Sequence, residues 1–350
     1  MTRIAGRWLA AFFVLVVGVS GPVRVWAKAE GPVRVGHFPN VTHAQALIGR
    51  SNGWFEERVG VGVEWKHFNA GPAAMEALLG GALDLTYVGP SPAINVYVRS
   101  QGKAIRIISG AAGGGALLIV RKGAGITKPE DFRGKKVAAP EIGNTQDVAL
   151  RHWLKSYRLS PVSQGGDVEV LAVKNPDILS LFQRGSLDAA WVPEPWATRL
   201  LQEAGGEVFL DERTLWPDGQ FTTVVLVARA EFLEQHRDVV ERFVQAHLEL
   251  TEWMVQHPDE AKVAVNQSLA TLLTQPLSEA VLNSAWERIT FTADPVAPSM
   301  ATSAVWAWEL GYLPGAEAPA LDGLFDLSAL NRLLGSKGQT PVAGATRPAL

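Results

Sequence analysis

The chain has 350 residues and no cysteine. It therefore contains no disulfide, no thiolate metal ligand and no cysteine nucleophile. Basic residues do not predominate either, with 32 lysines and arginines against 35 acidic residues. Because nucleic acids are bound through a basic surface, we expect no nucleic-acid partner. With 47% hydrophobic and 19% charged residues, the composition is that of a globular protein.

Motifs for catalysis and for metals are scarce as well. The sequence has no H-E-x-x-H zinc motif, and no G-K-[ST] follows the glycines at 113–115, which excludes a nucleotide-binding loop there. His37 and His43 lie close together, but no third residue nearby completes a metal site. We therefore expect a protein that is not an enzyme and that needs no cofactor and no metal.

The N-terminus has the pattern of a secretory signal peptide. Arg3 and Arg7 precede an apolar run over 8–19, and Val25-Trp26-Ala27 offers a cleavage site. Twelve apolar residues are too few for a membrane-spanning helix, which needs about 20. We expect residues 1–27 to be removed on export, which leaves 29 basic against 35 acidic residues. Without cysteine, no lipid anchor can be attached, so we expect a free periplasmic protein.

Two stretches of the chain show the same order of alternating strands and helices. Strands are expected over 32–36, 63–68, 83–88 and again over 136–139, 167–173, 187–192. Gly81-x-Leu83-Asp84-x-x-x-Val88 aligns with Gly185-x-Leu187-Asp188-x-x-x-Val192 at an offset of 104, and Val35 aligns with Val137 at an offset of 102. The pattern predicts two α/β lobes with mainly parallel sheets. As repeat-related residues, Asp84 and Asp188 are expected to have structural roles.

Two apolar, β-branched segments are expected to join the lobes. The segments 116–121 and 222–229 both end in arginine, and we expect them to form a two-strand hinge. The predicted division is lobe one at 28–118 plus 224–334, lobe two at 119–223, and a disordered tail at 335–350. Residues 231–335 show helical spacing of apolar residues, and we expect these extra helices to pack on lobe one.

Several segments of the sequence resemble a known family, the periplasmic binding proteins of nitrate, sulfonate and taurine uptake by ABC transporters. The resemblance lies in V-R-V-G-H-F-P (33–39), A-G-P-A-A-M-E-A-L-L-G-G-A-L-D (70–84), V-G-P-S-P-A (88–93), L-I-V-R-K-G-A-G-I-T-K-P-E-D-F-R-G-K-K-V-A (118–138), F-Q-R-G-S-L-D-A-A-W-V-P-E-P-W (182–196) and V-L-V-A-R-A-E-F-L (225–233).

The resemblance implies a type II periplasmic-binding-protein fold. It also implies a monomer that captures a small oxyanion-bearing solute, such as an aliphatic sulfonate or taurine, and passes it to an ABC permease. Nitrate, bicarbonate or a thiamine-precursor pyrimidine are alternative ligands. Other classes stay open: a same-fold enzyme, such as a pyrimidine synthase for thiamine or a dehydratase of menaquinone synthesis, or an exported sensor module.

The ligand is expected where helices begin, beyond the carboxyl ends of the strands. In lobe one the candidates are Phe38, Asn40, Thr42, His43, Pro90, Ser91, Gly110 and Ala111. Thr42 is expected to cap a helix in a capping box with Gln45. His43 could donate to an anion if protonated, or it is an ordinary packed residue. Gly110 and Ala111 could present backbone N–H groups.

In lobe two the candidates are Asn144, Thr145, Gln146, Glu194 and Trp196. The first three open a helix whose free N–H groups favour an anion, although simple capping explains them too. Trp196 walls the pocket or belongs to the core. Glu194 would meet an amine of the ligand, a metal or a hydroxyl, unless it merely complements the helix dipole.

Overall fold

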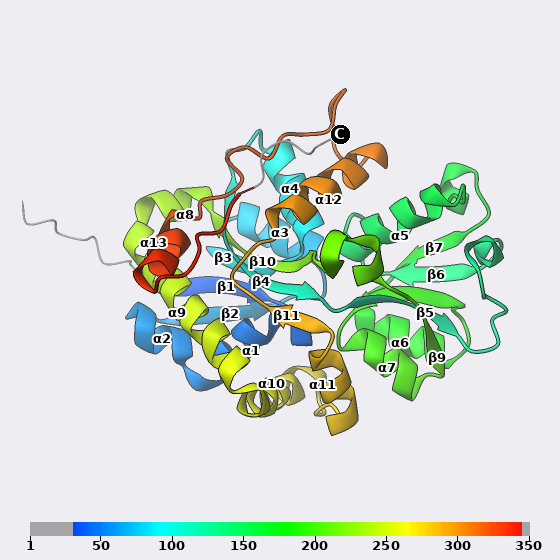
Figure 1. Cartoon of the computed structure of the whole chain (residues 1–350), viewed down its shortest axis with the longest axis horizontal. Coiled ribbons are helices and arrows are strands. Elements are labelled where there is room, and N and C mark those ends of the chain that lie inside the picture. Colours follow the sequence, from blue (N-terminus) through cyan, green and yellow to red (C-terminus); the bar gives the residue numbers. More distant parts are fainter. Residues whose placement is uncertain (1–30, 345–350) are drawn as a thin grey trace, which may run out of the picture.

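The computed structural model describes residues 31–344. The expected signal peptide at 1–27 and the end of the expected tail lie outside the described residues. Two β-sheets lie side by side, each flanked by helices (Figure 1).

The first sheet has the strand order β11-β4-β10-β3-β1-β2. Its strands are β1 (Val33–His37), β2 (Val63–His67), β3 (Leu85–Val88), β4 (Ile105–Gly114), β10 (Thr222–Arg229) and β11 (Ile289–Phe291). The helices between its first strands are α1 (Ala44–Asn52), α2 (Trp54–Val59), α3 (Gly71–Leu79) and α4 (Pro90–Arg99), with a 3-10 turn at Val41–His43.

The second sheet has the order β7-β6-β8-β5-β9. Its strands are β5 (Ala116–Arg121), β6 (Lys136–Ala139), β7 (Glu169–Ala172), β8 (Ala189–Pro193) and β9 (Gly206–Asp211). Its helices are α5 (Thr145–Ser156), α6 (Asn175–Gln183) and α7 (Trp196–Glu203). The C-terminal helices are α8 (Ala230–Gln235), α9 (Arg237–Gln256), α10 (Pro258–Leu273), α11 (Glu279–Trp286), α12 (Ala297–Glu309) and α13 (Ser328–Ser336).

The internal repeat predicted from the sequence appears in the strand register. Val35 pairs with Leu85 in the first sheet, and Val137 pairs with Ala189 in the second, which reproduces the offsets of 102 and 104. In each lobe the first strand of the repeat (β1 or β6) lies between the second (β2 or β7) and the third (β3 or β8), and all three are parallel. The two halves therefore share one topology.

The repeat-related aspartates hold equivalent strand ends together. Asp84 accepts the backbone N–H of Arg34 and pairs with the guanidinium of Arg229. Asp188 accepts the backbone N–H of Lys136 and pairs with Arg121. Each carboxylate thus ties the first strand of its lobe to the arginine that ends a neighbouring antiparallel element. The expectation of structural roles is confirmed by these contacts.

The expectation of mainly parallel sheets is wrong, because both sheets are mixed. β10 runs antiparallel to β3 and β4, and β5 runs antiparallel to β8 and β9. The strand that follows each change of lobe, β5 or β10, runs antiparallel to the repeat strand beside it. An alternation of strands and helices in the sequence predicts the parallel strands of such a sheet, but it does not reveal the antiparallel ones.

The chain changes sheet between β4 and β5, and again between β9 and β10. β5 pairs only within the second sheet and β10 only within the first, so neither strand itself crosses. Gly114 and Gly115 form the first crossing with φ of 70° and 67°, a left-handed conformation that favours glycine. The second crossing runs through residues 212–221. Both crossings lie a few residues before the boundaries expected from the sequence.

The C-terminal helices α11 and α12 contribute residues to the cores of lobe one, as expected, but both also contact lobe two. Trp306 of α12 stacks on His152 of α5 with ring centroids 4.4 Å apart. Glu309 of α12 accepts a salt bridge from Lys155 at 3.0 Å. On the other side, α11 contacts α7. These helices therefore bridge the lobes, which helical spacing along the sequence could not indicate.

The expected disordered tail is also corrected within the described residues. Asn331 of α13 exchanges two hydrogen bonds with the backbone of Val342, at 2.9 and 2.8 Å. Val342 packs against the core of the first lobe. A Gly- and Pro-rich composition suggested disorder, but one amide side chain and one apolar residue hold the segment to the helix.

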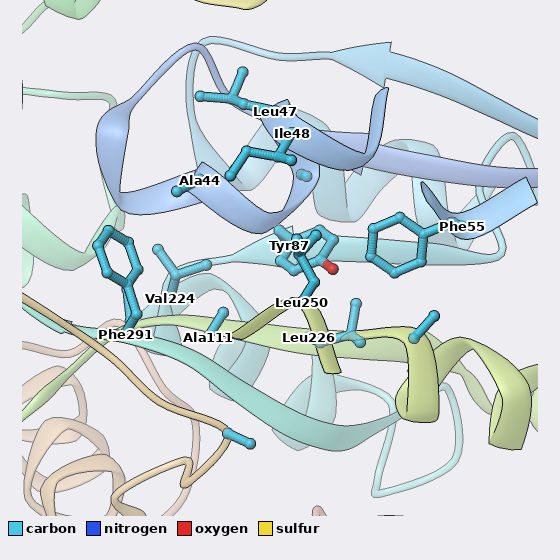
Figure 2. Close-up of a cluster of buried hydrophobic side chains, with 14 of the residues drawn as sticks. Ala44, Leu47, Ile48, Phe55, Tyr87, Ala111, Val224, Leu226, Leu250 and Phe291 are labelled. Carbon is cyan, nitrogen blue, oxygen red and sulfur yellow. The ribbon is translucent and has the colours of Figure 1, made fainter. Parts of the chain in front are cut away.

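The largest apolar core lies in the first lobe, between α1, the sheet and α9 (Figure 2). Leu47 and Ile48 of α1, Leu226 of β10 and Leu250 of α9 all belong to this core, and all four are fully buried. Burying such a side chain stabilises the fold by about 1.5–3 kcal/mol. This core fixes the start of α1 and the ends of β1 and β10, which border the site.

Candidate functional site

A polar cleft lies between the two lobes where their helices begin. The centre of a water-sized sphere can reach about 20 Å³ within it, and the unfilled space, open solvent included, is about 320 Å³. It is lined by Phe38, Asn40, Thr42, His43, Asn69, Gly89, Asn144, Thr145, Gln146, Asn175, Pro193, Thr223 and Val224. Seven of these residues were predicted from the sequence, and they come from both lobes.

Several polar side chains in this cleft are buried and have no hydrogen-bond partner. The hydroxyls of Thr42 and Thr145 and the amide oxygen of Asn175 are in this state. These residues are only 1%, 6% and 4% exposed. Most buried polar groups in proteins are hydrogen-bonded, so a group of exceptions at one place indicates atoms that bind something else.

Two expected helix caps do not form. Thr42 lies in the 3-10 turn before α1, and no side chain caps α1. Gln45, its expected partner, instead donates to the carbonyl of Ala111 at 2.8 Å. Asn144 precedes α5, and its side chain makes no capping bond there either. The side chains of Thr42 and Asn144 are therefore available to the cleft.

The start of α5 offers further donors. The first N–H groups of a helix have no partner within the helix and carry a partial positive charge. Thr145 and Gln146 begin α5 and line the cleft. Asn175 begins α6 on the same side. Together with Asn144, lobe two thus presents two helix starts and four polar side chains to one small volume.

His43 is buried and neutral rather than protonated. Burial holds the pKa of His43 well below its ordinary value of 6.5, and the nearby His37 ring lowers it further. Its Nδ1 accepts the backbone N–H of Phe38 at 3.3 Å. In a neutral ring this leaves the proton on Nε2, which becomes a donor. His43 can therefore donate to an anion without carrying a charge.

The lobes approach each other closely at Gly89. A Cβ atom at this position would lie 2.3 Å from Oγ1 of Thr145. Gly89 precedes α4 in lobe one, and Thr145 begins α5 in lobe two. The missing side chain is what lets the two helix starts meet, so the cleft is in a closed conformation.

Glu194 does not line the cleft. Its side chain is completely buried and accepts two hydrogen bonds from Thr198, from the N–H at 3.0 Å and from the hydroxyl at 2.9 Å. Arg288 lies 3.6 Å away as its counter-charge. Burial raises the pKa of Glu194 to about 7, against these partners. The interpretation that Glu194 complements the dipole of α7 fits this geometry, and the predicted contact with a ligand does not.

Trp196 is also set back from the cleft, but it reaches a residue that lines it. Its indole Nε1 donates to Oδ1 of Asn40 at 2.8 Å. Both residues are buried, and they belong to different lobes. The hydrogen bond therefore fixes Asn40 and holds the lobes together.

Four other predicted residues do not line the cleft. Pro90 and Ser91 belong to the first turn of α4, directly behind Gly89, and the Ser91 hydroxyl is buried without a partner. Gly110 and Ala111 lie inside β4. The N–H of Gly110 donates to the carbonyl oxygen of Ala293 at 2.7 Å, and Ala111 is buried in the core. Backbone groups already paired in a sheet cannot serve a ligand.

The sequence reasoning missed Asn69, Gly89, Asn175, Pro193, Thr223 and Val224. A signal for Asn175 existed, because Asn175-Pro176 begins the second helix of lobe two as Gly71-Pro72 begins that of lobe one. No comparable signal existed for Thr223 and Val224. They reach the cleft only because β10 returns beside β3 and β4.

The described residues hold no group of three or more His, Cys, Asp or Glu suited to a metal ion. Across residues 31–344, no helix combines the length and apolar character needed to cross a membrane.

The segment Gly49–Gly53 matches the G-x-S-x-G pattern of a nucleophile elbow. It forms the end of α1, however, and Ser51 donates to the carbonyl of Ile48 at 2.9 Å. A serine in that position is not presented as a nucleophile.

Several known proteins are similar to this chain in sequence. The taurine-binding periplasmic protein of Escherichia coli is 29% identical over 217 residues, which cover 61% of this chain and 64% of that protein. The bicarbonate-binding protein CmpA of Synechococcus elongatus is 23% identical over 270 residues, covering 70% of this chain and 59% of that protein. The chain thus spans somewhat less than two thirds of these relatives, which are named as binding proteins and not as enzymes.

Among solved structures, the alkanesulfonate-binding protein SsuA of Xanthomonas axonopodis bound to MOPS superposes with a TM-score of 0.69 at 17% identity, covering 83% of this chain and 97% of that one. The nitrate-binding protein NrtA of Synechocystis gives a TM-score of 0.73 at 16% identity, covering 87% and 88%. These likenesses confirm the predicted periplasmic-binding-protein fold. Since the model of the NMT1-like family matches residues 27–269, the chain belongs to that family.

Proposed function

We propose that the protein is an exported solute-binding protein of an ABC importer, a binder and not an enzyme. It captures a small oxyanion-bearing solute between its lobes and delivers it to the permease. One observation carries this proposal. Buried hydroxyl and amide groups without partners, from Thr42, Thr145 and Asn175, converge with helix starts in a cleft between two lobes.

The chemistry of these groups suits an oxyanion. Hydroxyls, the neutral His43 ring and the first N–H groups of α5 and α6 are all donors. A hydrogen bond to a charged group contributes about 1.5–3 kcal/mol. A micromolar dissociation constant corresponds to a binding free energy of about 8 kcal/mol. Four such hydrogen bonds supply roughly this amount after the cost of ordering the ligand and the side chains is subtracted. The amide of Asn175 serves as a donor after rotation about its last bond.

The names of similar proteins support the same ligand chemistry. They are described as binding taurine, alkanesulfonate, bicarbonate and nitrate. All of these molecules carry a small planar or tetrahedral group of oxygens. An aliphatic sulfonate is our first choice, and nitrate, bicarbonate and a pyrimidine are the alternatives to be tested beside it.

Capture requires the lobes to open and close. We place the hinge at the two crossings, Gly114–Gly115 and residues 212–221, with lobe one on one side and residues 116–211 as lobe two. Small-angle scattering should show a smaller radius of gyration in the presence of ligand. An unchanged radius with a ligand of proven affinity would exclude a clamshell motion.

Isothermal titration calorimetry tests the ligand and the site together. The panel is a set of alkanesulfonates, taurine, nitrate, bicarbonate and a pyrimidine. Thr145→Val removes one donor while keeping the shape of the side chain. It should weaken oxyanion binding roughly 10- to 150-fold, the equivalent of about 1.5–3 kcal/mol.

The matched control is Thr251→Val, which removes the hydroxyl of a buried threonine in α9, away from the cleft lining. This variant should bind as the wild type does. Binding of the pyrimidine alone would replace the oxyanion proposal. Equal affinity of wild type and Thr145→Val would place the site elsewhere in the molecule.

A further inference from the structure

The two carboxylates that stand next to cleft-lining residues in the sequence are already paired. No aspartate, glutamate, lysine or arginine is among the described residues that line it. The carboxylates next to lining residues in the sequence are Asp147, after Gln146, and Glu194, after Pro193. Both are buried within lobe two.

Both carboxylate oxygens of Asp147 are already hydrogen-bonded within the protein. Its Oδ1 accepts from Nε of Arg151 at 2.7 Å. Its Oδ2 accepts the N–H of Gly143 at 2.9 Å and the hydroxyl of Tyr312 at 2.7 Å. The carboxylate is thus neutralised by an arginine and turned towards the rear of the α5 start.

Glu194 is committed in the same way. Both of its oxygens are bonded to Thr198, and Arg288 lies beside Oε1 at 3.6 Å. Arg151 and Arg288 are in turn engaged with these carboxylates. The cleft is therefore lined by neutral groups, and its field comes mainly from the helix starts.

Such a field discriminates between the two ends of a zwitterion. The starts of α5 and α6 each carry about half a positive charge, which attracts an oxyanion and repels an ammonium group. An ammonium group has three donors and needs acceptors, preferably a carboxylate. Burying it without a counter-charge is costly. Neutral polar groups and uncharged alkyl groups meet no such penalty.

We propose that the ligand is an oxyanion without an ammonium group, such as an alkyl- or hydroxyalkylsulfonate, and that amino sulfonates of the taurine type are discriminated against. This inference rests on the proposed function. The Escherichia coli relative is named for binding taurine, so its name would suggest the opposite preference. That protein is only 29% identical to this chain.

The test uses three sulfonates with the same number of non-hydrogen atoms: propane-1-sulfonate, 2-hydroxyethanesulfonate and taurine. Calorimetry on the wild-type protein at neutral pH should show taurine binding at least tenfold more weakly than the other two. The hydroxy compound separates polarity from charge, because it should bind about as tightly as the propyl compound. Taurine binding equal to or tighter than propane-1-sulfonate would overturn the inference.

A variant provides an independent check. Glu194→Gln should leave the ratio of the taurine and propane-1-sulfonate dissociation constants unchanged, because the carboxylate does not face the ligand. A selective loss of taurine binding in this variant would show that Glu194 reaches the ligand and would refute the inference. If no sulfonate, nitrate or bicarbonate binds at all, the proposed function itself is wrong, which is a distinguishable result.

Discussion

Replacing Gly89 with alanine should displace the Thr145 hydroxyl from the cleft while leaving each lobe folded. Gly89 has φ of −70° and ψ of 158°, a conformation that alanine adopts without strain. The added methyl group would lie 2.3 Å from Oγ1 and 3.3 Å from Cβ of Thr145, across the cleft. The clash is therefore between lobes and not within one.

The size of the effect follows from the displacement. Ordinary van der Waals contact begins near 3.4 Å, so the hydroxyl of Thr145 must move by about 1 Å. Rotation of the side chain or movement of the lobe gives the same result, because the hydroxyl leaves its place in the cleft. Losing one hydrogen bond to a charged ligand costs about 1.5–3 kcal/mol, which weakens binding roughly 10- to 150-fold.

Calorimetry measures the loss of affinity, and small-angle scattering shows whether the radius of gyration still decreases with ligand. The control is Gly335→Ala in α13, where an added Cβ meets nothing within 4 Å. It should bind as the wild type does. In a Thr145→Ala background, Gly89→Ala should have little further effect. Wild-type affinity of Gly89→Ala would refute the closed arrangement of the two helix starts.

Three further results are expected. Trp196→Phe removes the interlobe bond to Asn40 and should weaken binding roughly 3- to 10-fold, about 0.5–1.5 kcal/mol; an unchanged Kd would mean that this bond does not favour closure. Burial raises the pKa of Glu212 to about 7, against an ordinary 4.5. The folded protein then holds more protons than the unfolded chain between these values, so stability should fall as pH rises through this window. Glu212→Gln should flatten the dependence of Tm on pH, and an equally steep curve would contradict this. Mass spectrometry of the protein from its native host should show a chain beginning near Lys28, whereas an intact N-terminus would contradict export.

The sequence by itself determined the repeated architecture. The offsets of 102 and 104 between the halves reappear in the strand register, because strands of the same pattern and length pair in the same way. It also located the helix starts of lobe two, where Asn144, Thr145 and Gln146 line the cleft. Local signals sufficed there, because residue preferences mark a helix start in the sequence, even though the Asn144 side chain makes no capping bond.

Only the tertiary structure decided which residues beside those starts face the ligand. Glu194 follows its strand just as Gly89 follows its own, yet it turns inward to Thr198 and Arg288. Gly110 and Ala111 are used within β4, because residues 292–293, which follow β11 far along the chain, hydrogen-bond to their backbone groups. Thr223 reaches the cleft on a strand that returns from the other lobe. Contacts between distant segments leave no periodic signal in the sequence, so the direction of a side chain at the end of a strand is settled only when those segments pack together.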